Sequence, residues 1–327
     1  MEYRTVAGLG DVSLLSLGSW NTFSRMAFED GIAMVGRALD EGVNLFDIGY
    51  YWDKPHTEVI FGRMLQVLNR PRDSYLLAEK LWLWEYPQQS FDEQLKASLL
   101  RLGTDHVDLV MVSRPLPGMD FEGFCDEVVA LVDSGLARAW GCTNWEPDEL
   151  LQAHTLLRAR GKPAPCMVQL QYNLARRAIA ENAAYADVFA KTGIKLCAAH
   201  TLEGGILGGH LERDRVQPSE AAQGKVPHER NIARDAGNIR EQIRSNYPAL
   251  QAIASDFNVT PAQAAIGFCL GHPALATVLV GVTRMEDLHD NLVALRLLPR
   301  SEDLRAALRP LGLDQVSHPR LFSPTNE

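Results

Sequence analysis

The feature that most constrains the fold is an alternation of short aliphatic runs with segments of helical periodicity. Eight runs have the length and apolar character of buried strands, and they cover residues 14–18, 43–47, 74–80, 107–113, 137–142, 166–171, 194–199 and 276–281. Strands that are apolar along their whole length are typical of parallel sheets covered on both faces. The alternation therefore predicts an α/β protein built on a parallel sheet.

Helices are expected between these runs because apolar residues recur there at intervals of three and four, as at Leu95, Leu99 and Leu102. The predicted helices cover residues 28–41, 57–68, 89–102, 119–134, 146–160, 178–191, 241–256, 261–271 and 285–294. Eight strand–helix units in about 300 residues favour a closed (β/α)8 TIM barrel over an open doubly wound sheet. No glycine-rich dinucleotide fingerprint follows any of the strands, which also disfavours the open sheet.

The remaining segments complete this prediction of a single domain over residues 1–327. A turn at residues 8–11 between two strand-like stretches predicts an N-terminal β-hairpin. Residues 203–240 form the longest irregular segment, a loop after strand 7 of the barrel, and such long loops are usually functional. The tail from about residue 317 is expected to be loosely ordered.

Composition excludes several classes of protein. A net charge of −9 without a basic stripe argues against nucleic-acid binding. No run of about 18 apolar residues predicts a membrane span, and the N-terminus lacks the pattern of a signal peptide. The odd number of cysteines and the lack of a CxxC pair favour reduced thiols in a cytoplasmic protein over disulfides or metal ligands. These cysteines are Cys125, Cys142, Cys166, Cys197 and Cys269.

Polar residues collect where the predicted strands end. They are Ser19 with Trp20, Asp47, Lys80, Ser113 with Arg114, Thr143 with Asn144, Gln169, His200 after Ala199, and Thr283 after Gly281. Each alone is explained by a strand end that meets water, but together they suit the end of a barrel where active sites lie. Asp47 beside Lys80 would tune a neighbouring acid. Thr143, Asn144 and Gln169 suit a carboxamide ligand.

Motifs along nearly the whole chain make it resemble the aldo-keto reductases, and most of all the branch with the potassium-channel β subunits and their bacterial relatives. The motifs are Asn44-Leu45-Phe46-Asp47 with Glu58 and Gly62, Ala78-Glu79-Lys80, Val107-Asp108-Leu109, Ser134-Gly135-Leu136-Ala137-Arg138, Gly141-Cys142-Thr143-Asn144-Trp145, Gln169-Leu170-Gln171-Tyr172-Asn173-Leu174, and Val280-Gly281-Val282-Thr283 with Asn291. The resemblance implies an eight-stranded barrel that uses NADPH to reduce a small-molecule carbonyl substrate. It leaves open whether the chain is a monomer, a tetramer or an octamer.

The resemblance also implies which residues hold the cofactor. Thr143, Asn144 and Gln169 would hold the nicotinamide end, with Ser19 and Trp20 near the nicotinamide and the substrate. His200 and Leu202 fall in the segment that follows the family's stacking aromatic, whose own position is Ala199. The segment for the adenosine 2′-phosphate and the adenine corresponds to Gly281, Thr283, Asp287, Asp290 and Asn291. The positive partner of that phosphate would be Arg284, or Arg230 or Arg234 in the long loop.

The sequence departs from the family at the catalytic tetrad of Asp, Tyr, Lys and His. In the family the lysine lowers the pKa of the tyrosine, which protonates the carbonyl oxygen while hydride reaches the carbonyl carbon. Asp47 and Lys80 match, but Trp52 occupies the tyrosine position and Ser113 the histidine position. An indole N–H has no proton to release near neutral pH, and loss of a general acid costs about 10²–10⁴-fold in rate.

Three replacements for the acid stay open: the phenol of Tyr51 or Tyr50 brought over Lys80, Lys80 itself, or a water held by Asp47 and Ser113. Three functions stay open as well. The first is a carbonyl reductase with a remodelled tetrad, acting on a large or unusual substrate because the stacking aromatic is lost. The second is an NADPH-binding regulatory or redox-sensing subunit. The third is a lyase or isomerase with Lys80 as base, although Lys80 beside Asp47 should stay cationic.

Overall fold

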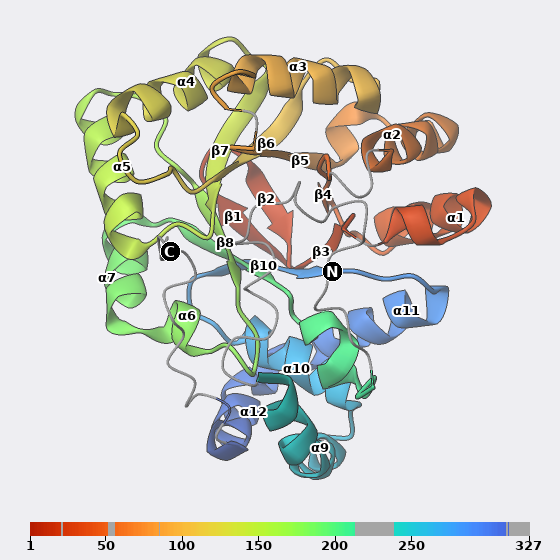
Figure 1. Cartoon of the computed structure of the whole chain (residues 1–327). Helices are drawn as coiled ribbons and strands as arrows, with labels where there is room; N and C mark the ends of the chain where they lie inside the picture. Colours follow the sequence, from red (N-terminus) through yellow and green to blue (C-terminus); the bar gives the residue numbers. More distant parts are fainter. Residues whose placement is uncertain (21, 52–55, 85, 213–238, 312, 314–327) are drawn as a thin grey trace.

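The computed structural model describes residues 1–20, 22–51, 56–84, 86–212, 239–311 and 313 of the chain. Eight parallel strands close a barrel in the order β10-β3-β4-β5-β6-β7-β8-β9, and helices surround it (Figure 1). The barrel strands are β3 (Leu15–Gly18), β4 (Leu45–Asp47), β5 (Leu76–Leu81), β6 (Val107–Ser113), β7 (Ala137–Thr143), β8 (Met167–Gln171), β9 (Lys195–Ala199) and β10 (Leu275–Val280). The predicted (β/α)8 barrel is therefore confirmed.

The helices follow the strands as the periodicity predicts. They are α1 (Phe28–Asp40), α2 (Thr57–Leu68), α3 (Phe91–Leu102), α4 (Phe121–Asp133), α5 (Pro147–Ala159), α6 (Ala178–Glu181), α7 (Ala183–Thr192), α9 (Ile239–Asp256), α10 (Pro261–Leu270), α11 (Met285–Val293) and α12 (Ser301–Leu308). Short 3-10 helices are η1 (Phe23–Arg25), η2 (Arg72–Ser74), η3 (Glu203–Gly208), η6 (Ala294–Arg300) and η7 (Arg309–Leu311). Local sequence fixes some of the ends: Ser90 and Glu93 form a capping box at α3, and Gly103 ends it in the left-handed region.

Three expectations need correction. The helix predicted over 178–191 is two helices, because Asn182 is extended and its side chain caps α7 by accepting the Tyr185 N–H. Helix α12 was not predicted. The segment 203–240 is not irregular throughout, since it starts as η3 and its last two residues belong to α9. Residues 213–238 and the tail predicted to be loose from about 317 lie outside the described residues.

The N-terminal hairpin covers the amino-terminal end of the barrel. Its strands β1 (Tyr3–Val6) and β2 (Gly10–Ser13) pair antiparallel, which confirms the predicted hairpin. Val6, Leu9 and Val12 pack against residues inside the barrel, among them Leu45 and Met167. With this end filled by apolar side chains, the carboxyl ends of the strands are the ones available for a site.

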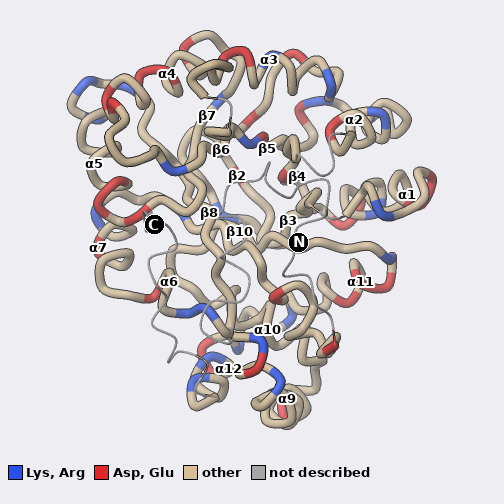
Figure 2. The backbone as a smooth tube through the Cα atoms, viewed as in Figure 1, with Lys and Arg blue, Asp and Glu red and all other residues tan. Residues whose placement is uncertain are grey.

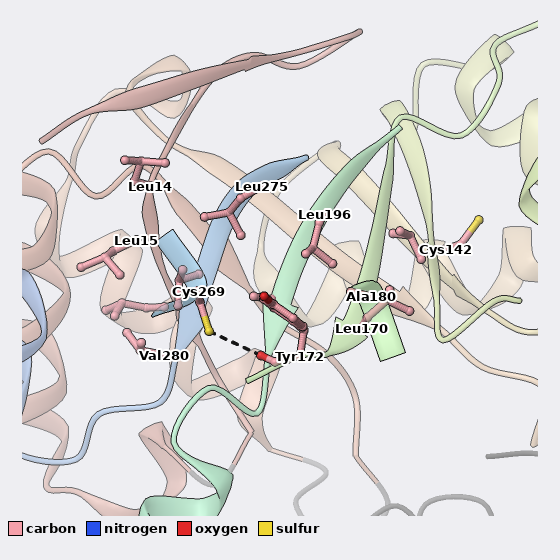
Figure 3. Close-up of a cluster of buried hydrophobic side chains, with 14 of the residues drawn as sticks. Leu14, Leu15, Cys142, Leu170, Tyr172, Ala180, Leu196, Cys269, Leu275 and Val280 are labelled. Atoms are coloured by element: carbon pink, nitrogen blue, oxygen red, sulfur yellow. Dashed lines mark hydrogen bonds between the residues drawn. The ribbon is translucent and has the colours of Figure 1, made fainter. Parts of the chain in front are cut away.

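The main core lies between the strands and the surrounding helices, and Figure 3 shows one part of it, near Leu170 and Leu196. All five cysteines are buried and free, as predicted for core thiols. Cys269, for example, donates its S–H to the backbone oxygen of Tyr172 at 3.7 Å (Figure 3). Charged residues of both signs are interspersed over the helices (Figure 2). Within the described ranges, no helix has the length and apolarity that a bilayer span requires.

Gly62 is expected to be indispensable for the close packing of α2 on α3. A Cβ at this position would lie 2.3 Å from the Leu102 carbonyl oxygen, a backbone atom that cannot move away. Gly62→Ala should therefore lower the free energy of unfolding by about 2 kcal/mol, because overpacking outweighs the gain in helix propensity. Urea denaturation followed by circular dichroism measures this. Gly36→Ala is the matched control, since its Cβ would meet only the movable end of the Leu68 side chain. Equal stabilities of the two variants would contradict the expectation.

Candidate functional site

Asp47 and Lys80 form a buried ion pair at the carboxyl end of the barrel. Asp47 ends β4, Lys80 lies on the neighbouring strand β5, and the Lys80 Nζ donates to Asp47 Oδ1. Burial opposes a charge on Lys80, but the Asp47 carboxylate overcomes it, and the pKa of Lys80 lies above its ordinary value. Lys80 is therefore cationic near neutral pH, which argues against its use as a base.

The phenol of Tyr51 lies beside this pair. Tyr51 is 2% exposed, and its Oη is 3.5 Å from Ser19 Oγ. A Cβ at Gly49 would lie 3.3 Å from Tyr51 Oη and 3.4 Å from Lys80 Cβ, so the missing side chain at Gly49 leaves room for the phenol next to the lysine. The ring of Tyr50, in contrast, packs under the guanidinium of Arg101 on α3, with 5.0 Å between Cζ and the ring centroid.

Trp52, which was predicted to occupy the family's tyrosine position, lies outside the described residues, as do Arg230 and Arg234.

The residues predicted to hold a carboxamide come together on β7 and β8. Thr143 and Gln169 are register partners, and the Asn144 N–H donates to the Gln169 backbone oxygen at 2.9 Å. Gln169 Nε2 donates to Asp47 Oδ2 at 3.2 Å, which links this group to the ion pair. The buried hydroxyl of Thr143 has no hydrogen-bond partner within the described residues. A buried hydroxyl group without a hydrogen bond destabilises the folded protein unless a ligand supplies the missing partner.

The other residues predicted near the nicotinamide border the same mouth. Trp20 follows β3 and meets the ring of His200 edge-on at 5.4 Å. Ser113 ends β6 in register with Thr143. Leu202 is partly buried and packs against the main core. The structure thus places the described catalytic and nicotinamide candidates at or after the carboxyl ends of barrel strands.

The segment predicted for the adenosine lies after β10. Arg284 precedes α11 and pairs with Asp287, with 2.6 Å between Nη2 and Oδ1. An open cavity of about 760 Å³ is lined by this segment and by Arg37 of α1, a cation that the sequence did not single out. Asp290 also lines this cavity, but its backbone oxygen and its Oδ1 both accept hydrogen bonds from Nε2 of Gln263 on α10.

Of the other members of this segment, Gly281 and Thr283 are exposed and Asn291 is buried. Gly281 and Thr283 form the connection from β10 to α11, and Asn291 is buried on α11. These residues therefore stand near Arg284 in the chain.

Behind Lys80 lies a buried carboxyl group that sequence reasoning missed. Glu79 accepts the Lys80 backbone N–H at 2.8 Å through Oε1, and its Oε2 has no partner in the described part of the chain. Glu58 of α2 is also fully buried and pairs with Arg101 of α3, Nη2 to Oε1 at 3.3 Å. Burial and then the Glu58 charge raise the pKa of Glu79 well above its ordinary value. This shift favours the protonated form of the Glu79 carboxyl group. The only sequence signal was a glutamate inside an apolar strand.

The raised pKa of Glu79 makes a prediction about stability and pH. Because the pKa of Glu79 is raised in the folded state, its contribution to stability is fully present below the pKa of an unfolded carboxyl, about 4.3. The contribution is lost as the pH rises toward the folded value. Glu79→Gln should therefore flatten the fall of the thermal midpoint between about pH 5 and 8 and raise the midpoint at pH 8. The exposed Glu2→Gln is the control. Curves parallel to the wild type for both variants would contradict this assignment.

A second cavity, of about 150 Å³, adjoins Lys80 on the side of α3. Trp82 and Trp84 form part of its wall and stack with 4.5 Å between centroids. Gln94 holds the loop of these tryptophans in place. Its Oε1 accepts the backbone N–H of Trp82, and its Nε2 donates to the backbone oxygen of Trp82, both at 2.9 Å. The sequence signal for this cavity was the pair of tryptophans, Trp82 and Trp84, that closely follows Lys80. The described residues contain no cluster of three His, Cys, Asp or Glu able to hold a metal.

Comparisons with known proteins agree with this arrangement. The chain is 26% identical over 326 residues to a protein named probable voltage-gated potassium channel subunit beta from Arabidopsis thaliana, covering 97% of this chain and 95% of the relative. A protein of the same name from Oryza sativa subsp. japonica is 27% identical over 308 residues, covering 91% and 92%. A thermostable aldo-keto reductase solved with the inhibitor epalrestat has the same fold, with a TM-score of 0.72, 22% identity, and coverage of 95% of this chain and 100% of that one.

The chain also matches the sequence model of a whole protein family. The sequence model of the Aldo/keto reductase family matches residues 14–308, which include every barrel strand. This range also contains the Asp47–Lys80 pair and the carboxamide-binding candidates of β7 and β8. The chain belongs to the aldo/keto reductase family.

Proposed function

We propose that the protein is an NADPH-dependent reductase of aldehydes or ketones in which Tyr51 is the proton donor. Family membership supports an oxidoreductase. The observation that carries the finer proposal is the buried phenol of Tyr51 next to Lys80 and Ser19. It supplies the acid that is missing where Trp52 replaces the family's tyrosine.

The residues of the mouth suit the nicotinamide end of the cofactor. The buried hydroxyl of Thr143 has no hydrogen-bond partner among the residues that the structure describes, and Gln169 lies next to Thr143 on β8. Together with Asn144 these groups would bind the carboxamide, since they offer both donors and acceptors. When bound, NADPH would supply the hydride that reduces the carbonyl carbon.

Tyr51 would donate its phenolic proton to the carbonyl oxygen of the substrate. The phenolate left behind would be stabilised by the Lys80 ammonium, which Asp47 holds in place. Ser19 would orient the phenol through the contact between their hydroxyl groups. The buried position of all these groups strengthens their electrostatic interactions, because little water screens them.

The substrate of this proposal is larger or less usual than a simple aldehyde. Ala199 leaves the position of the family's stacking aromatic without a ring. Trp20, Trp82 and Trp84 supply aromatic surface near the mouth instead. Such surfaces suit an apolar or aromatic carbonyl compound.

The proposal is tested by titrating the purified protein with NADPH while cofactor fluorescence is followed, and then adding a panel of aldehydes and ketones. We expect saturable binding and carbonyl-dependent oxidation of NADPH, fastest with bulky aryl substrates. Absence of binding contradicts the proposal outright, and binding without oxidation by any carbonyl contradicts the catalytic part.

A second candidate function is an NADPH-binding regulatory or redox-sensing subunit with little catalysis. The similarity to two plant proteins named as potassium channel β subunits favours it. In that case the protein would bind NADPH tightly but oxidise it slowly with every carbonyl. The panel described above separates the two functions.

Arg284 is expected to determine the preference for NADPH over NADH. It borders the cavity after β10, and a charge-assisted bond to the 2′-phosphate would replace its bond to Asp287. Arg284→Ala should weaken NADPH about tenfold and leave NADH within about twofold. Asp287→Asn should tighten NADPH, because it removes the competing carboxylate. Calorimetric titration of both nucleotides measures these effects. Equal losses for NADPH and NADH would contradict the assignment.

A further inference from the structure

The backbone of Lys80 lies where β5 extends beyond its neighbour β4. The two strands pair as far as Asp47 and Ala78, and the Ile48 N–H donates to the Ala78 oxygen at 2.8 Å. Alternate residues of a parallel strand direct their backbone groups toward the same neighbouring strand. The N–H of Lys80 is therefore directed to the side of β4, which has already ended at Asp47. A buried backbone N–H in this place needs another acceptor.

The side chain of Glu79 supplies that acceptor. Its Oε1 accepts the Lys80 backbone N–H at 2.8 Å. The next backbone N–H directed to this side, that of Trp82, is likewise accepted by a side chain, Gln94 Oε1 at 2.9 Å. Two side chains thus replace β4 along the end of β5. The one from Glu79 holds the residue whose ammonium group pairs with Asp47.

The carboxyl group of Glu79 is enclosed and incompletely bonded. The residue is fully buried, and its Oε2 has no hydrogen-bond partner among the described residues. An ionised carboxylate in such a place would be destabilised, because a charged oxygen would lack both water and a partner. Burial and then the charge of Glu58 accordingly raise the pKa of Glu79. The uncharged acid, which these effects favour, still accepts the Lys80 N–H through one oxygen.

Charged groups on four elements interact with Glu79. They are Glu58 on α2, Arg101 on α3, Asp47 on β4 and Lys80 on β5, whereas its register partner on β6 is the apolar Val110. Asp47 pairs with Lys80, and Glu58 pairs with Arg101. A charge on Glu79 would therefore be a third carboxylate beside two cations that are already paired, and it would compete for the Lys80 ammonium group.

We propose that Glu79 is a positioning residue for carbonyl reduction: its carboxyl group takes the place of the missing strand partner of Lys80 and fixes that lysine beside Asp47 and Tyr51. This role rests on the proposed function, in which the Lys80 ammonium stabilises the phenolate of Tyr51. Glu79 acts through the lysine and not on the reacting atoms. Its uncharged form leaves the ammonium group to the phenolate, whereas its ionised form would weaken that stabilisation.

The test compares two substitutions of Glu79, with kcat for carbonyl reduction measured from about pH 6 to 9. Glu79→Met removes the acceptor and should lower kcat about tenfold, because the lysine is no longer fixed, while the affinity for NADPH stays within about twofold. Glu79→Gln keeps an acceptor for the Lys80 N–H and cannot ionise. It should restore most of the kcat that Glu79→Met loses, and it should move the alkaline fall of kcat to higher pH than in the wild type.

Asp108→Asn is the matched control. Asp108 on β6 is also buried, and its Oδ2 accepts a different backbone N–H of β5, that of Leu77, at 2.9 Å. The substitution changes a carboxyl group to an amide, as Glu79→Gln does, but at a bond that lies nearer the amino-terminal end of β5. It should lower the thermal midpoint and leave the pH dependence of kcat parallel to that of the wild type.

The outcomes separate this inference from the proposed function. A wild-type protein that reduces no carbonyl overturns both. With an active wild type, the inference alone is overturned if Glu79→Met keeps the wild-type kcat, or if the pH profile of Glu79→Gln coincides with that of the wild type. Where Glu79→Met does not fold, the pH profile of Glu79→Gln decides.

Discussion

Replacing Tyr51 with phenylalanine is expected to lower kcat for carbonyl reduction by about 10²–10⁴-fold, the usual contribution of a positioned general acid. The phenol is the described tyrosine side chain that lies beside both Lys80 and Ser19. The substitution removes one oxygen and keeps the ring, which packs against Trp82 with 6.2 Å between centroids. The affinity for NADPH should therefore stay within about threefold. Steady-state kinetics with a bulky aldehyde and a parallel titration of NADPH measure the two quantities.

Trp52→Tyr is the companion variant, since it introduces a tyrosine at the position predicted to correspond to the family's tyrosine. If Tyr51 supplies the proton, this change should alter kcat by no more than about threefold. A rise of 10²-fold or more, with Tyr51→Phe fully active, would assign the missing acid to position 52 and contradict the role of Tyr51.

Lys80→Met is expected to have the second largest effect, because it removes the cation that stabilises the phenolate. Loss of such electrostatic stabilisation costs about 10²–10³-fold in kcat. The variant should also lose about 3–5 kcal/mol of stability, since Asp47 would be left buried without its partner. Kinetics and urea denaturation measure the two losses separately.

The double variant Asp47→Asn with Lys80→Met separates chemistry from stability. Without the buried carboxylate most of the stability should return, and Gln169 could still donate a hydrogen bond to the asparagine oxygen. The kcat for carbonyl reduction, in contrast, should stay as low as in the single variant Lys80→Met. A double variant that regains activity would show that Lys80 acts only as a structural partner of Asp47.

The sequence predicted the fold well because strand and helix periodicities are local signals. Runs rich in aliphatic residues such as 107–113 identified buried parallel strands. The ends of those strands identified Asp47, Lys80 and Gln169 as neighbours in a barrel. The break at Asn182 was missed because a single capping residue interrupts an otherwise regular helical pattern. The outer helix α12 was missed for want of a clear apolar stripe among its charged residues.

The functional site was predicted less completely, because several of its contacts depend on the tertiary structure. The sequence alone could not choose between Tyr50 and Tyr51, since the choice depends on the path of the chain past Gly49. The raised pKa of Glu79 depends on its burial and on the nearness of Glu58, which another element supplies. The cofactor roles of Thr283, Asp287, Asp290 and Asn291 stay predictions.

The most direct test of the central claim is a single turnover of bound NADPH. Stopped-flow absorbance would follow the nicotinamide after wild-type protein, loaded with one equivalent of NADPH, is mixed with an excess of a bulky aryl aldehyde. The account predicts that the bound cofactor is oxidised stoichiometrically, with an equal amount of alcohol formed. NADPH that binds fully but stays reduced with every carbonyl tested would contradict it.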